Sequence, residues 1–137
     1  MSCGKARPRR PGKIPDGGTR IAWVELVGLA LVLWAACGGV IAVGRKLWSI
    51  DTTLRVHLVA APVLAFLVAV MHKELAPAFD PLLRAAAITI MVILLDALLV
   101  APFFERSYAM FRSVIGTWLP FVAIFAACLA AGVLAQG

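Results

Sequence analysis

A single aspartate, Asp96, interrupts the apolar stretch VILLDALLV at residues 92–100. A carboxyl group at the centre of a membrane-spanning helix costs about 2.5–3.5 kcal/mol on insertion scales, so such residues usually face a bundle interior or a water-filled cavity. Two roles for this carboxyl group follow. Asp96 is either a buried hydrogen-bonding group that joins helices, or the binding group for a proton or a cation.

Two more polar side chains are candidates for the same intramembrane site. Thr89 precedes Asp96 by seven residues and so shares its helix face. His57 lies near the start of the preceding apolar segment, about 5 Å below the membrane surface at 1.5 Å of rise per residue, whereas Asp96 lies about 12 Å below it. A short connection predicts that these two segments pack side by side. We therefore expect His57 and Asp96 to interact, with Thr117 or Trp118 as the competing partner of Asp96.

Charged and hydroxyl side chains near the same segment ends form the expected rim of this pocket, namely Arg55, Glu105, Arg106 and Thr117. Part of this rim lies in the stretch FFERSYAMFRS, which combines charged residues with aromatic ones. Such a stretch forms either a solvated connector or a helix along the membrane interface.

Motifs of enzymes and metal sites are missing from the sequence. His57 and His72 lie near opposite ends of one segment, too far apart to bind one ion, and no cysteine pair has the C-x-x-C spacing. The sequence HKEL at His72 lacks the second histidine of a metalloprotease helix, and neither a phosphate-binding glycine loop nor a nucleophile elbow occurs. We expect no catalytic activity, no metal and no cofactor.

The composition indicates an integral membrane protein. Hydrophobic residues make up 63% of the 137 residues and charged residues only 15%, far from the values of soluble domains. About 20 apolar residues in a helix cross the hydrocarbon core. Four segments qualify, at residues 21–44, 54–72, 82–104 and from 114 or 118 to 135. Short connections predict an all-α bundle of four transmembrane helices over residues 21–137.

Residues 1–20 have a different composition, rich in Pro, Gly, Lys and Arg. Such a segment cannot bury enough apolar surface to fold, so we expect a disordered basic tail, which either only determines the topology or also lies against anionic lipid headgroups. Basic residues also favour the cytoplasmic side, and eight of them flank the spans on the side of the N-terminus against five on the other. Both termini are therefore expected in the cytoplasm. Without the six basic residues of the tail, the count becomes two against five and the expectation reverses.

Local signals mark the helix ends. Asp80 and Pro81 are a typical cap and first residue for the third helix. Alternative caps exist for the second helix, at Asp51, Thr52 and Thr53, and for the fourth, at Ser113 and Thr117. Small residues at helical spacing predict which helix faces lie inside the bundle. On the first helix this face comprises Glu25, Gly28, Val32, Ala35, Ala36 and Gly39; on the second, His57, Ala60, Ala61, Leu64 and Ala65.

The stretches RVHLVAAPVLAF and LLDALLVAPFFERSYAMFRSVIGTWLPF resemble an uncharacterised family of small four-helix inner-membrane proteins of bacteria. The resemblance covers residues 22–135 and implies a four-helix architecture and the inner membrane. It also implies a family pattern at His57, Pro62, Asp96, Glu105, Arg106, Phe111, Gly116, Thr117, Trp118 and Pro120, without assigning these residues a role.

Two function classes remain. The first is a structural or accessory membrane component that assists a partner protein, with Asp96 and His57 as packing residues. The second is a minimal transporter, acting as a homo-oligomer, with a proton- or cation-linked site at Asp96. Both imply the lipid bilayer as the surroundings and no nucleic acid as a partner.

Overall fold

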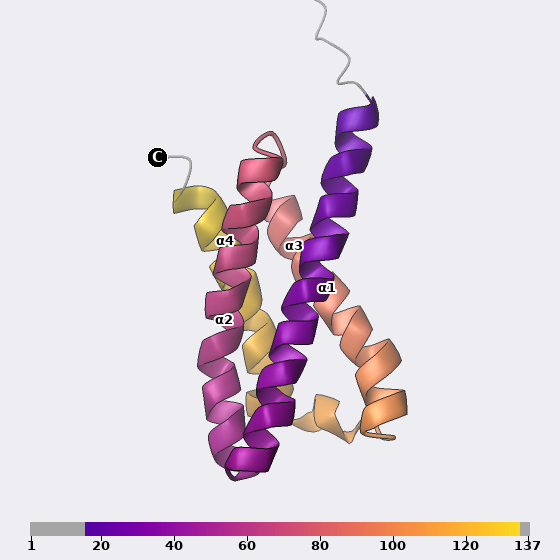
Figure 1. The fold of residues 1–137 in the computed structure, drawn as a ribbon, viewed down its shortest axis with the longest axis vertical. Coiled ribbons are helices and arrows are strands. Elements are labelled where there is room, and N and C mark those ends of the chain that lie inside the picture. The colour runs from indigo at the N-terminus through magenta and orange to yellow at the C-terminus, as the bar shows by residue number, and fades with distance from the viewer. Residues whose placement is uncertain (1–15, 135–137) are drawn as a thin grey trace, which may run out of the picture.

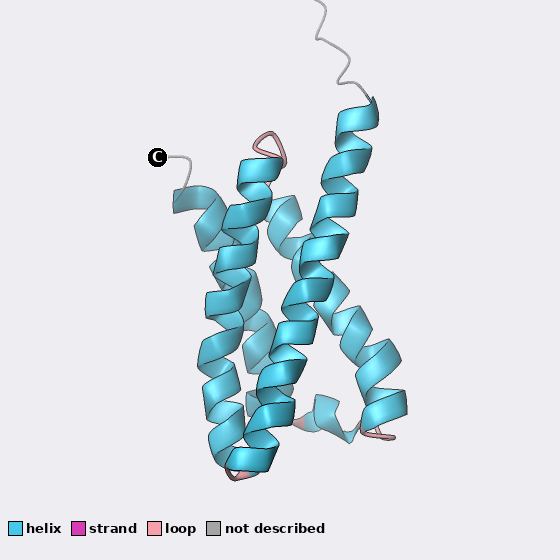
Figure 2. Cartoon of the chain, viewed as in Figure 1, coloured by secondary structure: helices cyan, strands magenta, loops and turns pink. Residues whose placement is uncertain are grey.

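The protein is represented by a computed structural model, which describes residues 16–134. Four long helices with short connections form the bundle (Figures 1 and 2). Helix α1 comprises Asp16–Leu47 and α2 comprises Ile50–Leu75. Helix α3, Pro81–Leu95, continues without a break into the π-helix η1, Asp96–Phe104. A short 3₁₀ helix η2, Ala109–Arg112, and a π-helix η3, Val114–Trp118, lead into α4, Leu119–Leu134.

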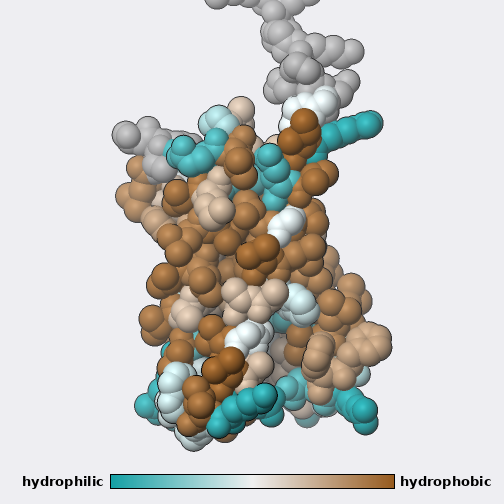
Figure 3. Space-filling view, viewed as in Figure 1, coloured by the Kyte–Doolittle hydropathy of each residue, from teal (hydrophilic) through white to brown (hydrophobic). Residues whose placement is uncertain are grey.

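All four predicted spans are confirmed as helices that are long and apolar enough to cross a membrane. They are Gly17–Leu47, Ile50–Leu75, Pro81–Phe104 and Val114–Leu134. In Figure 3 a broad hydrophobic band lies between hydrophilic groups at the two ends of the molecule. Large apolar side chains point outward along this band, as Val24, Val59 and Leu98 do. Such a surface is stable against lipid and not against water, so the chain is a multi-pass membrane protein.

The first helix is longer than predicted. It begins at Asp16, so residues 16–20 of the expected tail are helical, whereas residues 1–15 lie outside the described part. It ends at Leu47, only three residues before α2 begins at Ile50. The polar residues at both ends extend the helix because they need not enter the hydrocarbon core.

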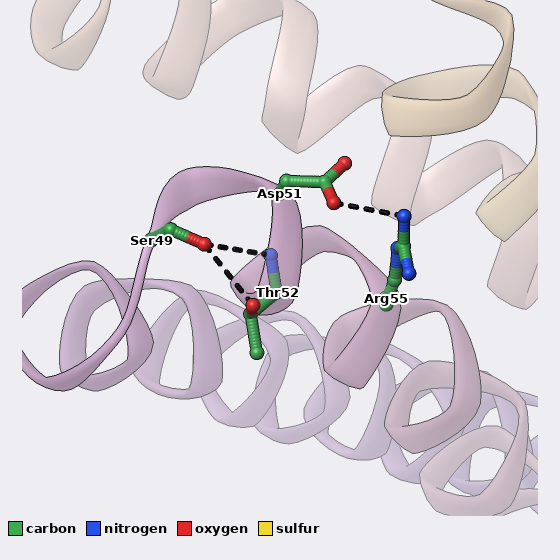
Figure 4. Close-up of polar contacts among 4 residues, drawn as sticks. All are labelled: Ser49, Asp51, Thr52 and Arg55. Carbon is green, nitrogen blue, oxygen red and sulfur yellow. Dashed lines mark hydrogen bonds and ion pairs between the residues drawn. The ribbon is translucent and has the colours of Figure 1, made fainter.

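Ser49 caps α2, so the expected caps at Asp51, Thr52 and Thr53 are wrong (Figure 4). Its hydroxyl oxygen accepts a hydrogen bond from the Thr52 amide at 3.3 Å. Asp51 instead forms an ion pair with Arg55, one turn further along the helix, at 2.9 Å. Ser49 takes the cap because α1 ends just before it, so α2 begins at Ile50, four residues before the predicted apolar segment.

The sequence predicted the cap of the third helix and left two alternatives for the fourth. Asp80 accepts a hydrogen bond from the Leu83 amide at 2.8 Å, and Pro81 is the first residue of α3, as predicted. Of the two alternatives for the fourth span, Ser113 is the cap, because its hydroxyl accepts from the Gly116 amide at 3.0 Å.

Helices α2 and α3 are not neighbours in the bundle, contrary to prediction. Helix α2 packs against α1 and α4, while α3 packs against α4 and α1. Five residues, Ala76–Asp80, join α2 to α3. Because an extended chain spans about 3.3–3.6 Å per residue, this loop can reach about 16 Å, well beyond the 8–10 Å between packed helices. A short loop therefore permits α2 and α3 to lie diagonally across the bundle.

The buried faces agree with the prediction on α2 and differ from it on α1. On α2, His57, Ala61 and Ala65 are buried as expected. On α1, Gly28 and Gly39 are exposed, and the buried residues are Ala22, Leu26, Ala30, Leu33 and Cys37. Larger side chains fill the interface of α1 because its neighbours already supply small residues, such as Ala61 and Ala65 of α2.

Candidate functional site

Asp96 lies where α3 changes into the π-helix η1. Its Oδ1 atom accepts a hydrogen bond of 2.8 Å from the indole Nε1 of Trp34, on the facing part of α1. The expected partners His57, Thr117 and Trp118 form no hydrogen bond with Asp96. This prediction is wrong because the bundle places α1, and not α2, beside α3.

The π-helical geometry of η1 has a covalent reason. Pro102 has no amide hydrogen, and its ring would clash with the carbonyl one α-turn before it. In the wider π-helix the amide bonds reach five residues back, as from Glu105 N to Val100 O at 2.9 Å. Segments of this kind occur frequently at functional sites. Here the change of geometry begins at the one aspartate of the helix.

A cavity of about 490 Å³ adjoins Asp96. In Figure 1, η1 and the end of α3 diverge from α1 toward the α1–α2 connection. The lining of the cavity comes from all four spans: Trp34, Ala35, Cys37, Gly38, Gly39, Ile41, Ala42 and Arg45 of α1; His57 of α2; Val92, Asp96, Val100 and Phe104 of α3 and η1; and Gly116, Thr117, Pro120, Phe121 and Ile124 of η3 and α4. Glu105 and Met110 complete it. The cavity is thus mainly apolar, with a few polar groups.

The charges of the lining side chains do not sum to zero. Arg45 and Glu105 form an ion pair at 3.2 Å, with their side chains 51% and 43% exposed. Asp96 is then the third charged group, so two carboxyl groups and one guanidinium line the cavity when all are ionised. The pairing of Arg45 with Glu105 leaves Asp96 without a cationic partner among residues 16–134. Its one hydrogen bond comes from the neutral indole of Trp34.

His57 contributes a second unsatisfied polar group to the lining. It is 8% exposed, and its Nδ1 atom is fully buried without a hydrogen-bond partner in the described part of the chain. Thr117 is different, because its hydroxyl already donates to the Met110 carbonyl at 2.6 Å. His57 and Asp96, which were expected to interact within one polar pocket, therefore line the same cavity without a direct hydrogen bond between them.

Three of the other candidates lie outside the cavity. Thr89 is buried on α3 with its hydroxyl unpaired, but it lies two turns from Asp96, beyond the reach of the cavity. Arg55 pairs with Asp51 on the surface, and Arg106 adopts a left-handed backbone conformation with φ 50° in the connection after η1. Of the predicted rim, Glu105 and Thr117 line the cavity, and Arg45 takes the place expected for Arg55 and Arg106.

A second polar cluster lies at the opposite end of the bundle and was missed in the sequence. Arg84 of α3 is 1% exposed, and its Nε atom donates to His72 Nδ1 at 2.9 Å. Its Nη2 atom donates to the carbonyls of Ala76 and Phe79 at 3.0 and 3.1 Å. Since His72 Nδ1 accepts, its Nε2 carries the hydrogen and donates to the Ala22 carbonyl of α1 at 2.9 Å.

This cluster ties α1, α2 and α3 together through hydrogen bonds of Arg84 and His72, which indicates a structural role. The signal for this cluster in the sequence was Arg84, a basic residue one turn after Asp80, but the sequence-based prediction placed it at the membrane surface. Among residues 16–134, no group of three or more potential metal ligands lies close enough to hold an ion.

Searches with this chain against protein-family models, curated proteins and solved structures gave no match. The site therefore has to be understood from its own geometry.

Proposed function

We propose that this protein is a minimal transporter in which Asp96 binds a proton or a cation inside the cavity. The observation that carries the proposal is the position of Asp96 on the wall of an apolar cavity of about 490 Å³, with no cationic side chain paired to it. The proposal places the protein in the bacterial inner membrane, with both termini in the cytoplasm.

The negative charge of Asp96 has a free-energy cost in this apolar cavity. An ionised carboxylate in an apolar environment is costly unless it is paired, and a hydrogen bond from a neutral donor recovers only part of this cost. A proton or a bound cation removes the rest. Trp34 also presents an aromatic ring to the cavity, and aromatic faces attract cations.

Proton flux into liposomes, followed with an internal pH-sensitive dye, tests this proposal. We expect flux coupled to a panel of organic cations for the wild-type protein and none for Asp96→Asn. The asparagine oxygen can still accept from Trp34, so this variant removes the charge and keeps the hydrogen bond. Asp51→Asn is the matched control, because Asp51 is exposed and outside the cavity lining. Equal flux for Asp96→Asn and wild type, or none for either, contradicts the proposal.

The hydrogen bond itself supports the second candidate, a structural or accessory component. It joins α1 to α3 beside the cavity. On this hypothesis the wild-type protein shows no flux with any cation, and Asp96→Leu reduces the yield of folded protein in detergent. The transporter hypothesis instead expects flux for the wild type, and an Asp96→Leu variant that is less stable but still folds and has no flux.

A further inference from the structure

We infer that the molecule bound in the cavity is a small organic cation that also carries a hydrogen-bond acceptor, with the cationic group at Asp96 and the acceptor at His57. This inference rests on the proposed function, and it adds the chemical class of the substrate.

The contribution of His57 follows from its two ring nitrogens. A neutral imidazole has one N–H donor and one acceptor nitrogen. Neither nitrogen of His57 forms a hydrogen bond with a described residue, and Nδ1 is sealed from the cavity. Buried N–H groups without partners are rarer in proteins than buried acceptors without partners, so Nδ1 is assigned as the unpaired acceptor. The hydrogen then lies on Nε2, on the ring edge that remains for the cavity, where it can donate to an acceptor of a bound molecule.

The other polar groups of the lining are already engaged. Arg45 and Glu105 pair with each other, and the Thr117 hydroxyl donates to Met110. Asp96 uses Oδ1 for Trp34, so its second oxygen remains for a cation. Asp96, on the α3 side, is therefore the carboxylate of the lining that no described cation neutralises, and His57, on the α2 side, is the lining side chain whose ring nitrogens have no described partner.

The apolar part of the lining determines the size and the hydrophobic character of the bound molecule. Trp34, Val92, Phe121 and Ile124 contribute aromatic and aliphatic surface. A volume of about 490 Å³ falls in the range of about 300–1,000 Å³ that holds drug-sized ligands. An arylalkylamine with an ether, hydroxyl or carbonyl oxygen away from the amine meets all three requirements.

Phenylbutylamine and its para-methoxy derivative are suitable probes, because they differ in one acceptor oxygen. Their affinities for the full chain in detergent can be compared by equilibrium dialysis. One added hydrogen bond predicts about tenfold tighter binding of the methoxy compound, which corresponds to about 1.4 kcal/mol. We expect His57→Phe to abolish this preference and to retain binding of the parent amine. His57→Gln, whose amide can donate from a position close to that of Nε2, should keep part of the preference.

Thr89→Val is the matched control, because it also removes an unpaired buried polar group but lies outside the cavity. Each variant is compared only where its melting curve shows folded protein. The inference fails if neither amine binds the wild type, if both bind equally, or if His57→Phe keeps the preference.

Failure of the proposed function has a different signature, because Asp96→Asn would then leave the affinity of both amines unchanged. Binding of the neutral compound phenylbutanol distinguishes a cavity for organic cations from a cavity for a purely apolar occupant such as a lipid chain. If it binds as tightly as phenylbutylamine, the cavity does not select cations and both proposals are overturned.

Discussion

Asp96 is accepted within an apolar helix because a residue 62 positions earlier in the chain supplies a donor. The indole of Trp34 donates to the carboxyl group at 2.8 Å, and Asp96 also lines the cavity. Removal of one partner from such a pair leaves the other unpaired, which costs about 1–3 kcal/mol. Replacement of both partners by apolar groups removes the cost of burying them.

A double-mutant cycle on Trp34 and Asp96 should therefore show strong coupling. We expect Trp34→Phe and Asp96→Leu each to lower the free energy of unfolding by about 1–3 kcal/mol, and the double variant to lose much less than their sum. Reversible unfolding in mixed micelles measures these values. Additivity within about 0.5 kcal/mol would show that the hydrogen bond does not contribute to stability. A cycle on His57 and Asp96 should be additive, since no hydrogen bond joins them.

The buried hydrogen bonds of Arg84 give a second prediction at the residue scale. Arg84→Met should lower the free energy of unfolding by about 3–5 kcal/mol, because it leaves His72 and two carbonyls without their donor in a buried site. Arg55→Met, which removes an exposed ion pair, should cost at most about 1 kcal/mol. Equal melting temperatures for the two variants would contradict the assigned structural role of Arg84.

At the scale of elements, one glycine sets the approach of α4 to α3. A Cβ atom at Gly132 would lie 2.6 Å from Pro81 Cβ and 3.3 Å from its Cα atom. Pro81 is the rigid first residue of α3, so it cannot turn aside as a flexible side chain would. By contrast, Gly28 of α1 has no atom within 4 Å of such a Cβ.

The two glycines form a matched pair for substitution by alanine. We expect Gly132→Ala to destabilise the bundle by about 1–3 kcal/mol through overpacking. Gly28→Ala should be neutral, or stabilise by up to about 1 kcal/mol through the higher helix propensity of alanine. Thermal unfolding of both variants in the same detergent gives the comparison. A tolerated Gly132→Ala would mean that α3 and α4 separate more easily than their packing indicates.

At the scale of the whole molecule, the connecting loops do not decide which helices touch. Helices α1 and α2 form an antiparallel hairpin, α4 packs against α2 and α3, and α3 closes the bundle against α1. Both termini of the described chain lie at the same end (Figure 1), where Arg84 is buried. Arg84 therefore does not act as a surface charge, and Lys73 is then the one basic residue flanking the spans at this end outside residues 1–20.

Orientation in the membrane should therefore depend on the basic N-terminal residues. A green fluorescent protein fused after Gly137 should fluoresce and an alkaline phosphatase fused there should be inactive, as for a cytoplasmic C-terminus. Replacement of all six basic residues at positions 1–20 by glutamine should invert both signals, because five basic residues flank the spans at the other end. Reporter activities that stay unchanged would show that the tail does not set the orientation.

The sequence by itself determined the number of spans, their approximate limits and the cap at Asp80. These features depend on composition and on residues within one helical turn, so local patterns carry them. It also singled out Asp96, because the cost of a carboxyl group in hydrocarbon can be recognised without knowing its neighbours. The resemblance of the chain to bacterial inner-membrane proteins remains a prediction.

Only the tertiary structure decided the partner of Asp96, the burial of Arg84 and the cavity. Each depends on which helices are adjacent, and a loop of five residues is compatible with either adjacent or diagonal packing. Side-chain volume decides between adjacent and diagonal packing. Leu26 and Leu33 of α1 pack in the same core as Ala61 and Ala65 of α2. That arrangement turns Trp34 toward Asp96 and leaves His57 on the opposite wall of the same cavity.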